Sequence, residues 1–149
     1  MAKEILCECK EREEVKLYGL WTRSSLSSAE TEWEHLMSLY SAKTGDKGIR
    51  FVIRENTNEK KDCDLFCGGL TPGEGVSEVV VPAGTYVSTV VTPKFGLFWG
   101  SAMDDADIFL RNEWPEQNGC RLDDFRMEIR NMMGKKPSIE IIYRVLPRE

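Results

Sequence analysis

Two neighbouring segments near the C-terminus each carry one glutamate between apolar residues. The first, FRMEIRN, contains Glu128, and the second, SIEIIYRVLP, contains Glu140. Both segments alternate as β-strands do, so each glutamate faces either water or a cavity that favours negative charge. A carboxylate in a cavity loses hydration, at a cost on the order of several kcal/mol unless a partner restores the interaction. A delocalised organic cation is such a partner, because its apolar body needs little hydration of its own.

Strand alternation gives Glu128 two interpretations. The residue shares one strand face with Arg126 and Arg130. The simpler interpretation is a solvated face on which Glu128 pairs with a flanking arginine. The sharper interpretation places Glu128 in a ligand cavity, with Glu140 as a second candidate.

Aromatic side chains supply candidate walls for such a cavity, and the chain contains four tryptophans. The face of an aromatic ring attracts a cation by about 0.5–2 kcal/mol. Packing in the core accounts for each of these residues as well as ligand contact does. The aromatic candidates for ligand contact are Trp21, Phe66, Trp99, Trp114, Tyr86 and Tyr143.

The sequence offers few residues suited to nucleophilic catalysis, metal binding or phosphate binding. The single histidine, His35, lies off the apolar face of its predicted helix, and no motif for nucleophilic catalysis is present. The five cysteines lack C-x2-C spacing, and alternation puts Cys63 and Cys67 on one face with Leu65, which favours buried thiols over a zinc site. The glycine pairs match no phosphate-binding loop. We expect no metal and no cofactor, and general acid or base catalysis by Glu128 is the remaining enzymatic alternative.

The composition favours one cytoplasmic domain. The chain has 149 residues, of which 41% are hydrophobic, enough for a single core. A net charge of −5 argues against direct binding of nucleic acid, which requires clustered basic residues. No signal-peptide core and no apolar run of about 18 residues is present, so we expect no membrane contact. An odd number of cysteines without an export signal favours reduced thiols.

The first half of the chain predicts the order β-α-β-β. The predicted strands are 15–24, 49–55 and 62–70. The helix begins at a capping box, Ser27-x-x-Glu30, in which the two side chains satisfy the first unpaired backbone donors. Its apolar stripe follows helical spacing and comprises Trp33, Leu36, Met37 and Tyr40.

The second half predicts the same order. Residues 78–91 form a strand pair or one long strand broken at Pro82-Ala83-Gly84, and strands 125–131 and 138–146 end the chain. An amphipathic helix lies between them, and Trp114-Pro115 is expected to end it because proline cannot continue a helix. Its apolar stripe comprises Phe95, Phe98, Trp99, Ala102, Met103, Ala106, Phe109 and Leu110.

The repeated order indicates an α+β fold made of two β-α-β-β units with antiparallel sheets and two long amphipathic helices. The pseudo-repeats are about 15–70 and 78–147, joined by 71–77, within one domain spanning 1–149. One unit covers only one face of its sheet. Two units side by side complete a common core and leave a ligand cleft at their seam.

An ordered set of motifs marks the second half. These are VPAGTY (81–86), the Trp114-Pro115 helix end followed by Asn118-Gly119, the Met127-Glu128 strand and the closing strand 138–147. The first half adds a strand with a central glycine, Gly19, before its aromatic helix. The set resembles the GyrI-like small-molecule-binding domain, which is also the effector-binding domain of AraC-type and MerR-type transcription activators. The chain departs from the family pattern at Arg130 and Arg144.

The resemblance implies a duplicated α+β domain of SHS2-like repeats, whose cleft binds bulky, flat, often cationic organic molecules through aromatic walls and an internal glutamate. We therefore expect a protein that binds a hydrophobic cationic aromatic compound for sensing or sequestration, linked to transcription regulation or drug resistance. Some members of the family hydrolyse cyclopropane-bearing natural products and some act on DNA gyrase. A hydrolase of electrophilic natural products and a gyrase-modulating protein are the alternatives.

Only about 14 residues precede the first predicted strand, too few for a helix-turn-helix unit. We therefore expect a stand-alone binder, or one that passes its signal to a protein partner such as a DNA-binding regulator or gyrase. The sequence leaves both a monomer and a homodimer open.

Overall fold

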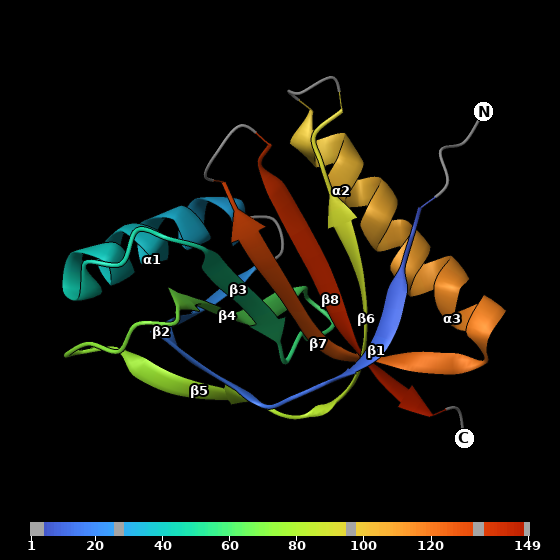
Figure 1. Cartoon of the computed structure of the whole chain (residues 1–149), viewed down its shortest axis with the longest axis horizontal. Coiled ribbons are helices and arrows are strands. Elements are labelled where there is room, and N and C mark those ends of the chain that lie inside the picture. Colours follow the sequence, from blue (N-terminus) through green and yellow to red (C-terminus); the bar gives the residue numbers. More distant parts are fainter. Residues whose placement is uncertain (1–4, 26–28, 95–97, 133–135, 148–149) are drawn as a thin grey trace.

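One curled antiparallel sheet, with helices on one of its faces, makes up the fold (Figure 1). The computed structural model describes residues 5–25, 29–94, 98–132 and 136–147, and eight strands lie in these parts of the chain, in the order β1-β6-β8-β7-β3-β4-β2-β5. The strands are β1 (Glu8–Arg12), β2 (Val15–Ser25), β3 (Arg50–Glu55), β4 (Asp62–Gly69), β5 (Ser77–Val81), β6 (Gly84–Val91), β7 (Cys120–Asn131) and β8 (Ser138–Pro147). The helical segments are α1 (Ala29–Thr44), α2 (Trp99–Ile108), the π-helical turn η1 (Phe109–Glu113) and α3 (Trp114–Asn118). The predicted α+β class is confirmed.

The two halves of the chain meet in the middle of the sheet. The first half supplies β2, α1, β3 and β4, the second supplies β6, α2, β7 and β8, and in each half the strand after the helix lies innermost. These inner strands, β3 and β7, pair with each other, with Val52 opposite Glu128 and Arg54 opposite Arg126. The repeated β-α-β-β order is therefore present, and the β3–β7 pair, which we call the seam, brings side chains of both halves together.

The outer strands tie the edges of the sheet together. The ladder between β1 and β6 places Arg12 opposite Gly84, and the ladder between β2 and β5 continues in the same register with Val15 opposite Val81. The segments 8–25 and 77–91 are therefore two long strands, each bent once, that pair with each other over 8–19 and 77–88. Because β1 and β5 are the two edge strands, this pairing curls the sheet. The break expected at Pro82-Ala83-Gly84 is confirmed as the bend, whereas the charged strand β1 was not predicted.

Two apolar layers cover the two faces of the sheet. On the helix-free face, side chains from strands far apart in the sheet order contact each other because the sheet curls around them: Leu17, Phe51, Ile53, Phe66, Val81, Tyr86, Met127 and Ile142. On the other face, α1 packs on the first half and α2 on the second. The helices lie on either side of the seam in Figure 1, which leaves the seam strands between them. Within the described residues, no helix has the length and apolarity needed to cross a bilayer.

The helix predictions are confirmed for α1 and partly wrong for α2. Leu36, Met37 and Tyr40 are buried as their spacing predicts, whereas the capping box lies outside the described residues. The second helical arm does not end at Trp114-Pro115. It widens into the π-turn η1 and continues as α3, because Pro115 lies in the first turn of α3, where its missing N–H leaves no hydrogen bond unmade. Phe98, expected on the apolar stripe, is 56% exposed at the start of the arm.

Candidate functional site

A row of three charged residues lies on the helix-facing side of β7. Arg126, Glu128 and Arg130 alternate along the strand and are 5%, 4% and 7% exposed. The shared face that alternation predicted is confirmed. It is buried rather than solvated, because Trp33 of α1 and Asp107 of α2 lie against its arginines.

Glu128 is held on both sides by these arginines. Arg130 donates from Nε to Glu128 Oε1 at 2.6 Å, and Arg126 donates from Nη1 to Oε2. The guanidinium of Arg130 also lies over the ring of Trp33, 4.1 Å from its centroid, in a cation–π arrangement. Both oxygens of the Glu128 carboxylate are therefore engaged by cations of the protein itself.

Arg126 extends this network to the second helix. It donates from Nε and Nη2 to the two oxygens of Asp107, at 3.1 and 2.8 Å, which is the forked geometry that makes arginine–carboxylate pairs strong. The hydroxyl of Tyr143 on β8 donates to the same carboxylate at 2.8 Å. The network therefore runs from Trp33 on α1 across the seam to Asp107 on α2.

The pKa values show that these groups keep fixed charges. Burial alone would raise the pKa of Glu128, but Arg126 and Arg130 outweigh it and lower this pKa to about 2. Burial likewise opposes the charge of Arg126, and the carboxylates of Glu128 and Asp107 more than compensate, so the pKa of Arg126 is raised. Burial raises the pKa of Tyr143 to about 12. Near neutral pH, Glu128 stays ionised and Tyr143 stays neutral, so neither exchanges protons readily.

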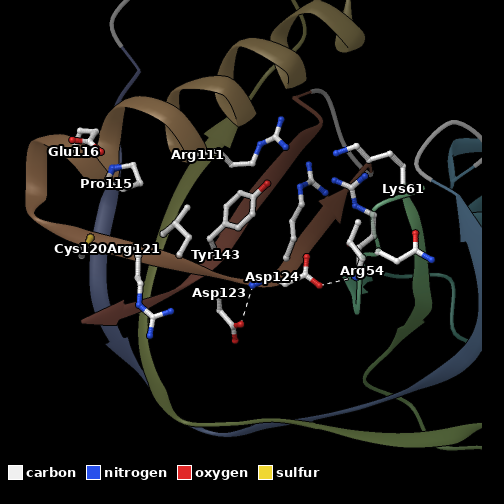
Figure 2. Close-up of a pocket in the computed structure, with 14 residues that line it drawn as sticks. Arg54, Lys61, Arg111, Pro115, Glu116, Cys120, Arg121, Asp123, Asp124 and Tyr143 are labelled. Atoms are coloured by element: carbon white, nitrogen blue, oxygen red, sulfur yellow. Dashed lines mark hydrogen bonds between the residues drawn. The ribbon is translucent and has the colours of Figure 1, made fainter. Parts of the chain in front are cut away.

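A cavity of about 630 Å³ lies beside the network, between the helical arm and the seam (Figure 2). This volume is within the range of about 300–1,000 Å³ typical of small-molecule sites. Both halves of the chain contribute to its walls. The lining residues are Arg54, Thr57, Asn58 and Lys61 from the first half, and Arg111, Pro115, Glu116, Cys120, Arg121, Leu122, Asp123, Asp124, Arg126 and Tyr143 from the second.

Three of the lining residues form a row across neighbouring strands. Arg54 on β3 lies opposite Arg126 on β7, and Arg126 lies opposite Tyr143 on β8. Opposite residues of adjacent strands share a face, so all three side chains lie on the helix side of the sheet. Burial lowers the pKa of Arg54 and the neighbouring charge of Arg126 lowers it further, while the carboxylates of Glu128 and Asp107 act in the opposite direction.

The acidic side of the cavity arises from an irregularity in β7. The register with β8 shifts between Leu122 and Arg126, and Asp123 and Asp124 lie in the shifted segment. Asp124 accepts a hydrogen bond from the backbone N–H of Thr57 at 2.8 Å, which anchors the β3–β4 loop to β7. Asp123 accepts one from the backbone N–H of Asp124 at 2.8 Å.

Of the side chains expected to contact a ligand, Tyr143 lines this cavity. Tyr86 lines a second cavity of about 150 Å³ on the other face and donates to the carbonyl of Pro82 at 2.6 Å. Glu128 is buried among arginines and does not line the larger cavity, which corrects the expectation that its charge is left for a ligand. Glu140 pairs with Arg12 at 2.9 Å.

The other aromatic candidates pack in the apolar layers. Phe66 is fully buried on the helix-free face, and Trp21 lies against it with ring centroids 5.2 Å apart. Trp99 and Trp114 belong to the layer beneath α2, since the helical arm continues past Trp114. His35 is exposed on α1, and the predicted shared face of Cys63 and Cys67 is buried.

Sequence reasoning missed the polar residues that shape the cavity. Alternation in IRFVIRE places Arg54 on the same face as Val52, but nothing local shows that this face meets Arg126 of a distant strand. Asp107 and Arg111 lie on the polar side of a helix whose apolar stripe alone was interpreted. Only the packing of the helical arm over the seam reveals their role.

Comparisons with known proteins show what shares this fold. No family model matches the chain, and no curated protein matches it. Among solved structures, SAV2435 bound to tetraphenylphosphonium has a TM-score of 0.70 at 9% identity, with 95% of this chain and 94% of that chain covered. The EcmrR C-terminal domain has a TM-score of 0.67 at 20% identity, with 96% and 98% covered. An integron cassette protein from the mobile metagenome of Vibrio cholerae has a TM-score of 0.65 at 12% identity, with 94% and 95% covered.

At these identities the likeness shows the fold. The coverage of both chains is nearly complete for all three structures, so the shared architecture includes the sheet, both helical arms and the seam between them. The architecture expected from the resemblance to GyrI-like domains is consistent with these structures.

Proposed function

We propose that this protein binds a small organic molecule in the cavity beside the seam and acts as an effector-binding or sequestering protein. The observation that carries the proposal is the cavity of about 630 Å³, whose walls come from both halves of the chain. Pro115, Leu122 and the ring of Tyr143 offer apolar contact, and the charged residues around them offer orientation.

The structural relatives support this proposal. SAV2435 shares the fold and has been solved with tetraphenylphosphonium, and EcmrR carries the fold as its C-terminal domain and has been solved as a complex with DNA. By analogy, ligand binding by this chain would serve sensing or drug sequestration in the cytoplasm, with a regulator as the partner that reads the bound state.

The expected preference for hydrophobic cations has one external support, the tetraphenylphosphonium of SAV2435. In this chain, the carboxylate that was expected to select a cation is Glu128, which two arginines already neutralise. The test of function therefore has to include cationic compounds. Glu128 is also poorly suited to the acid or base role that a hydrolase would need, because a pKa of about 2 leaves it no proton to donate near neutral pH and makes it a weak base, so we propose binding without turnover.

A thermal-shift screen with size-matched cationic, neutral and anionic aromatic compounds tests the proposal. A compound present at 100 times its Kd stabilises the folded protein by about 2.7 kcal/mol, which is visible as a rise in Tm. Thr57→Trp fills the cavity from the β3–β4 loop, at a side chain for which the described residues provide no hydrogen bond. Thr31→Trp places the same bulk on the exposed surface of α1 and is the matched control.

We expect hits to stabilise the wild-type protein and Thr31→Trp, and to leave Thr57→Trp unchanged. Mass spectrometry of the incubated compound should return it intact. The absence of any hit, or equal stabilisation of both tryptophan variants, would refute binding in this cavity. A product formed in stoichiometric amount would contradict binding without turnover and would indicate catalysis.

A further inference from the structure

We infer that the ligand of this cavity carries an anionic group, a carboxylate or a phosphoryl group, bound between Arg54 and Arg111. The inference rests on the proposed function and names its ligand class. It reverses the charge preference that the sequence suggested, because five basic and three acidic residues line the cavity and Glu128 is not among them.

The side-chain environment of Arg54 is the main support for an anionic ligand. Its side chain is half-buried and lies opposite Arg126, and among the residues that the structure describes no carboxylate oxygen lies within 4 Å of it. A like charge directly across a strand pair is unfavourable, and burial lowers the pKa of Arg54 as well. The carboxylates of Glu128 and Asp107 oppose both effects from beyond ion-pair distance, so Arg54 has no direct anionic partner among the described residues.

The carboxylates that bind Arg126 are not available to form an ion pair with Arg54. The three nitrogens of Arg126 are committed to Asp107 and Glu128, and Glu128 is shared with Arg130. Two cations and two carboxylates thus close the buried network at zero net charge. The positive charge of Arg54 is not part of this balance.

Arg111 faces the same space from η1. Within the described part of the chain it makes one hydrogen bond, from Nε to the carbonyl oxygen of Asp107 at 3.4 Å, so both terminal amino groups are available. Its charge is close enough to Tyr143 to influence that hydroxyl. Figure 2 shows Arg111 and Tyr143 on one side of the cavity, with Arg54 and Lys61 on the other. Two guanidinium forks on opposite walls suit a planar carboxylate or a phosphoryl group.

Of the three acidic lining residues, Asp124 lies beside Arg54, whereas Asp123 and Glu116 lie farther from it (Figure 2). Asp124 is bonded to the loop backbone at Thr57, and Glu116 lies at the far end of the cavity with Arg121 (Figure 2). Arg54, Arg111 and Lys61 therefore bring more positive than negative charge to this end, which we call the basic end of the cavity. An aromatic body with one anionic group would place that group at the basic end and its ring against Leu122 and Tyr143.

Isothermal titration calorimetry with four matched probes tests the inference: 2-naphthoate, 2-naphthyl phosphate, 2-naphthamide and 2-naphthylmethylammonium. We expect one or both anions to bind the wild-type protein at least about tenfold more tightly than the amide, since hydrogen bonds to charged groups exceed neutral ones by that margin. The two anions distinguish carboxylate from phosphoryl recognition. Raising the salt concentration should weaken the anions and spare the amide.

Arg54→Gln and Arg111→Gln should each weaken the anions by about tenfold and leave the amide unchanged. Arg23→Gln, which changes an exposed arginine outside the cavity, is the matched control and should change neither. Arg54→Lys keeps the charge without the fork and should retain part of the affinity. A far-UV circular dichroism spectrum and a melting curve of each variant confirm that it is folded.

Three outcomes separate the two proposals. Equal affinity for anion and amide, or tighter binding of the ammonium, overturns the anionic ligand and leaves small-molecule binding intact. Loss of amide binding along with anion binding in Arg54→Gln also overturns it, because the effect is then not one of charge. If none of the four probes binds the wild-type protein at millimolar concentration, both proposals fail.

Discussion

Arg54 on β3 lies directly opposite Arg126 on β7, so two guanidinium groups are cross-strand neighbours at the seam. Arg126 is bound by Asp107 and Glu128, whereas the described residues place no carboxylate oxygen within 4 Å of Arg54. Like charges opposite each other destabilise a strand pair. We therefore expect the position of Arg54 to cost stability, as is common for residues kept for binding.

Replacement of Arg54 should reveal this cost. Arg54→Met keeps most of the apolar stem and removes the charge, so we expect the free energy of unfolding to rise by about 0.5–1 kcal/mol. Urea denaturation measures the change. Arg23→Met, at an exposed pair with Asp64, should stay within about 0.5 kcal/mol of the wild type. A clear loss of stability in Arg54→Met would mean that Arg54 supports the fold.

Glu128 should behave in the opposite way. Its side chain is 6% exposed and bound by two arginines, so Glu128→Gln leaves buried cations without their anion. We expect a loss of about 3 kcal/mol or more in the free energy of unfolding. Glu140→Gln is the matched control on β8, because the Arg12–Glu140 pair is partly exposed and its loss should cost less than about 1 kcal/mol. Similar losses in the two variants would refute the structural role of Glu128.

The same carboxylate predicts an acid dependence of stability. Folding lowers the pKa of Glu128 from 4.5 to about 2, so the unfolded chain takes up this proton at a higher pH than the folded chain does. The stabilisation is complete above about pH 4.5 and is lost as the pH falls towards 2. We expect the difference in Tm between wild type and Glu128→Gln to narrow over this range. A difference that stays constant down to pH 2 would contradict the lowered pKa.

The buried hydroxyl of Tyr143 predicts that the stability of the protein falls at alkaline pH. Burial raises its pKa to about 12 from 10, so the unfolded chain loses the phenolic proton first, and the stabilisation present below pH 10 is lost as the pH rises towards 12. Tyr143→Phe removes the hydrogen bond to Asp107 and should cost about 1 kcal/mol at neutral pH. Melting curves from pH 9 to 12 should fall less steeply for Tyr143→Phe. Parallel curves would argue against the buried hydroxyl.

A glycine pair sets the approach of β2 and β4. Gly19 lies opposite Gly68, and a Cβ on Gly19 would come within 2.2 Å of the carbonyl oxygen of Cys67. Gly19→Ala should therefore destabilise the protein by about 2 kcal/mol or more. Gly100→Ala is the control, because no atom lies within 4 Å of its added Cβ and alanine favours a helix, so stability should stay equal or rise by up to about 1 kcal/mol. Equal effects would refute the close approach.

Local patterns in the sequence determined the elements. The spacing of Leu36, Met37 and Tyr40 gave the first helix, and alternation gave the strands of both repeats, because periodicity depends on the backbone geometry of each element alone. The same logic put Arg126 and Arg130 on the face of Glu128. It was wrong about Trp114-Pro115, since a proline in the first turn of a new helix needs no donor.

The site was decided by tertiary structure. Whether Glu128 meets a ligand or two arginines depends on burial by α1 and α2, and Arg54 becomes a neighbour of Arg126 only through a strand pair between residues far apart in the chain. Asp107 reaches Arg126 because the helical arm packs across the seam. The strength of a charge interaction depends on the distance between the charges and on their burial. Both are set by the tertiary structure and cannot be obtained from the order of residues. The sequence therefore fixes which side chains face together on one strand, and packing alone decides which of their charges remain unpaired.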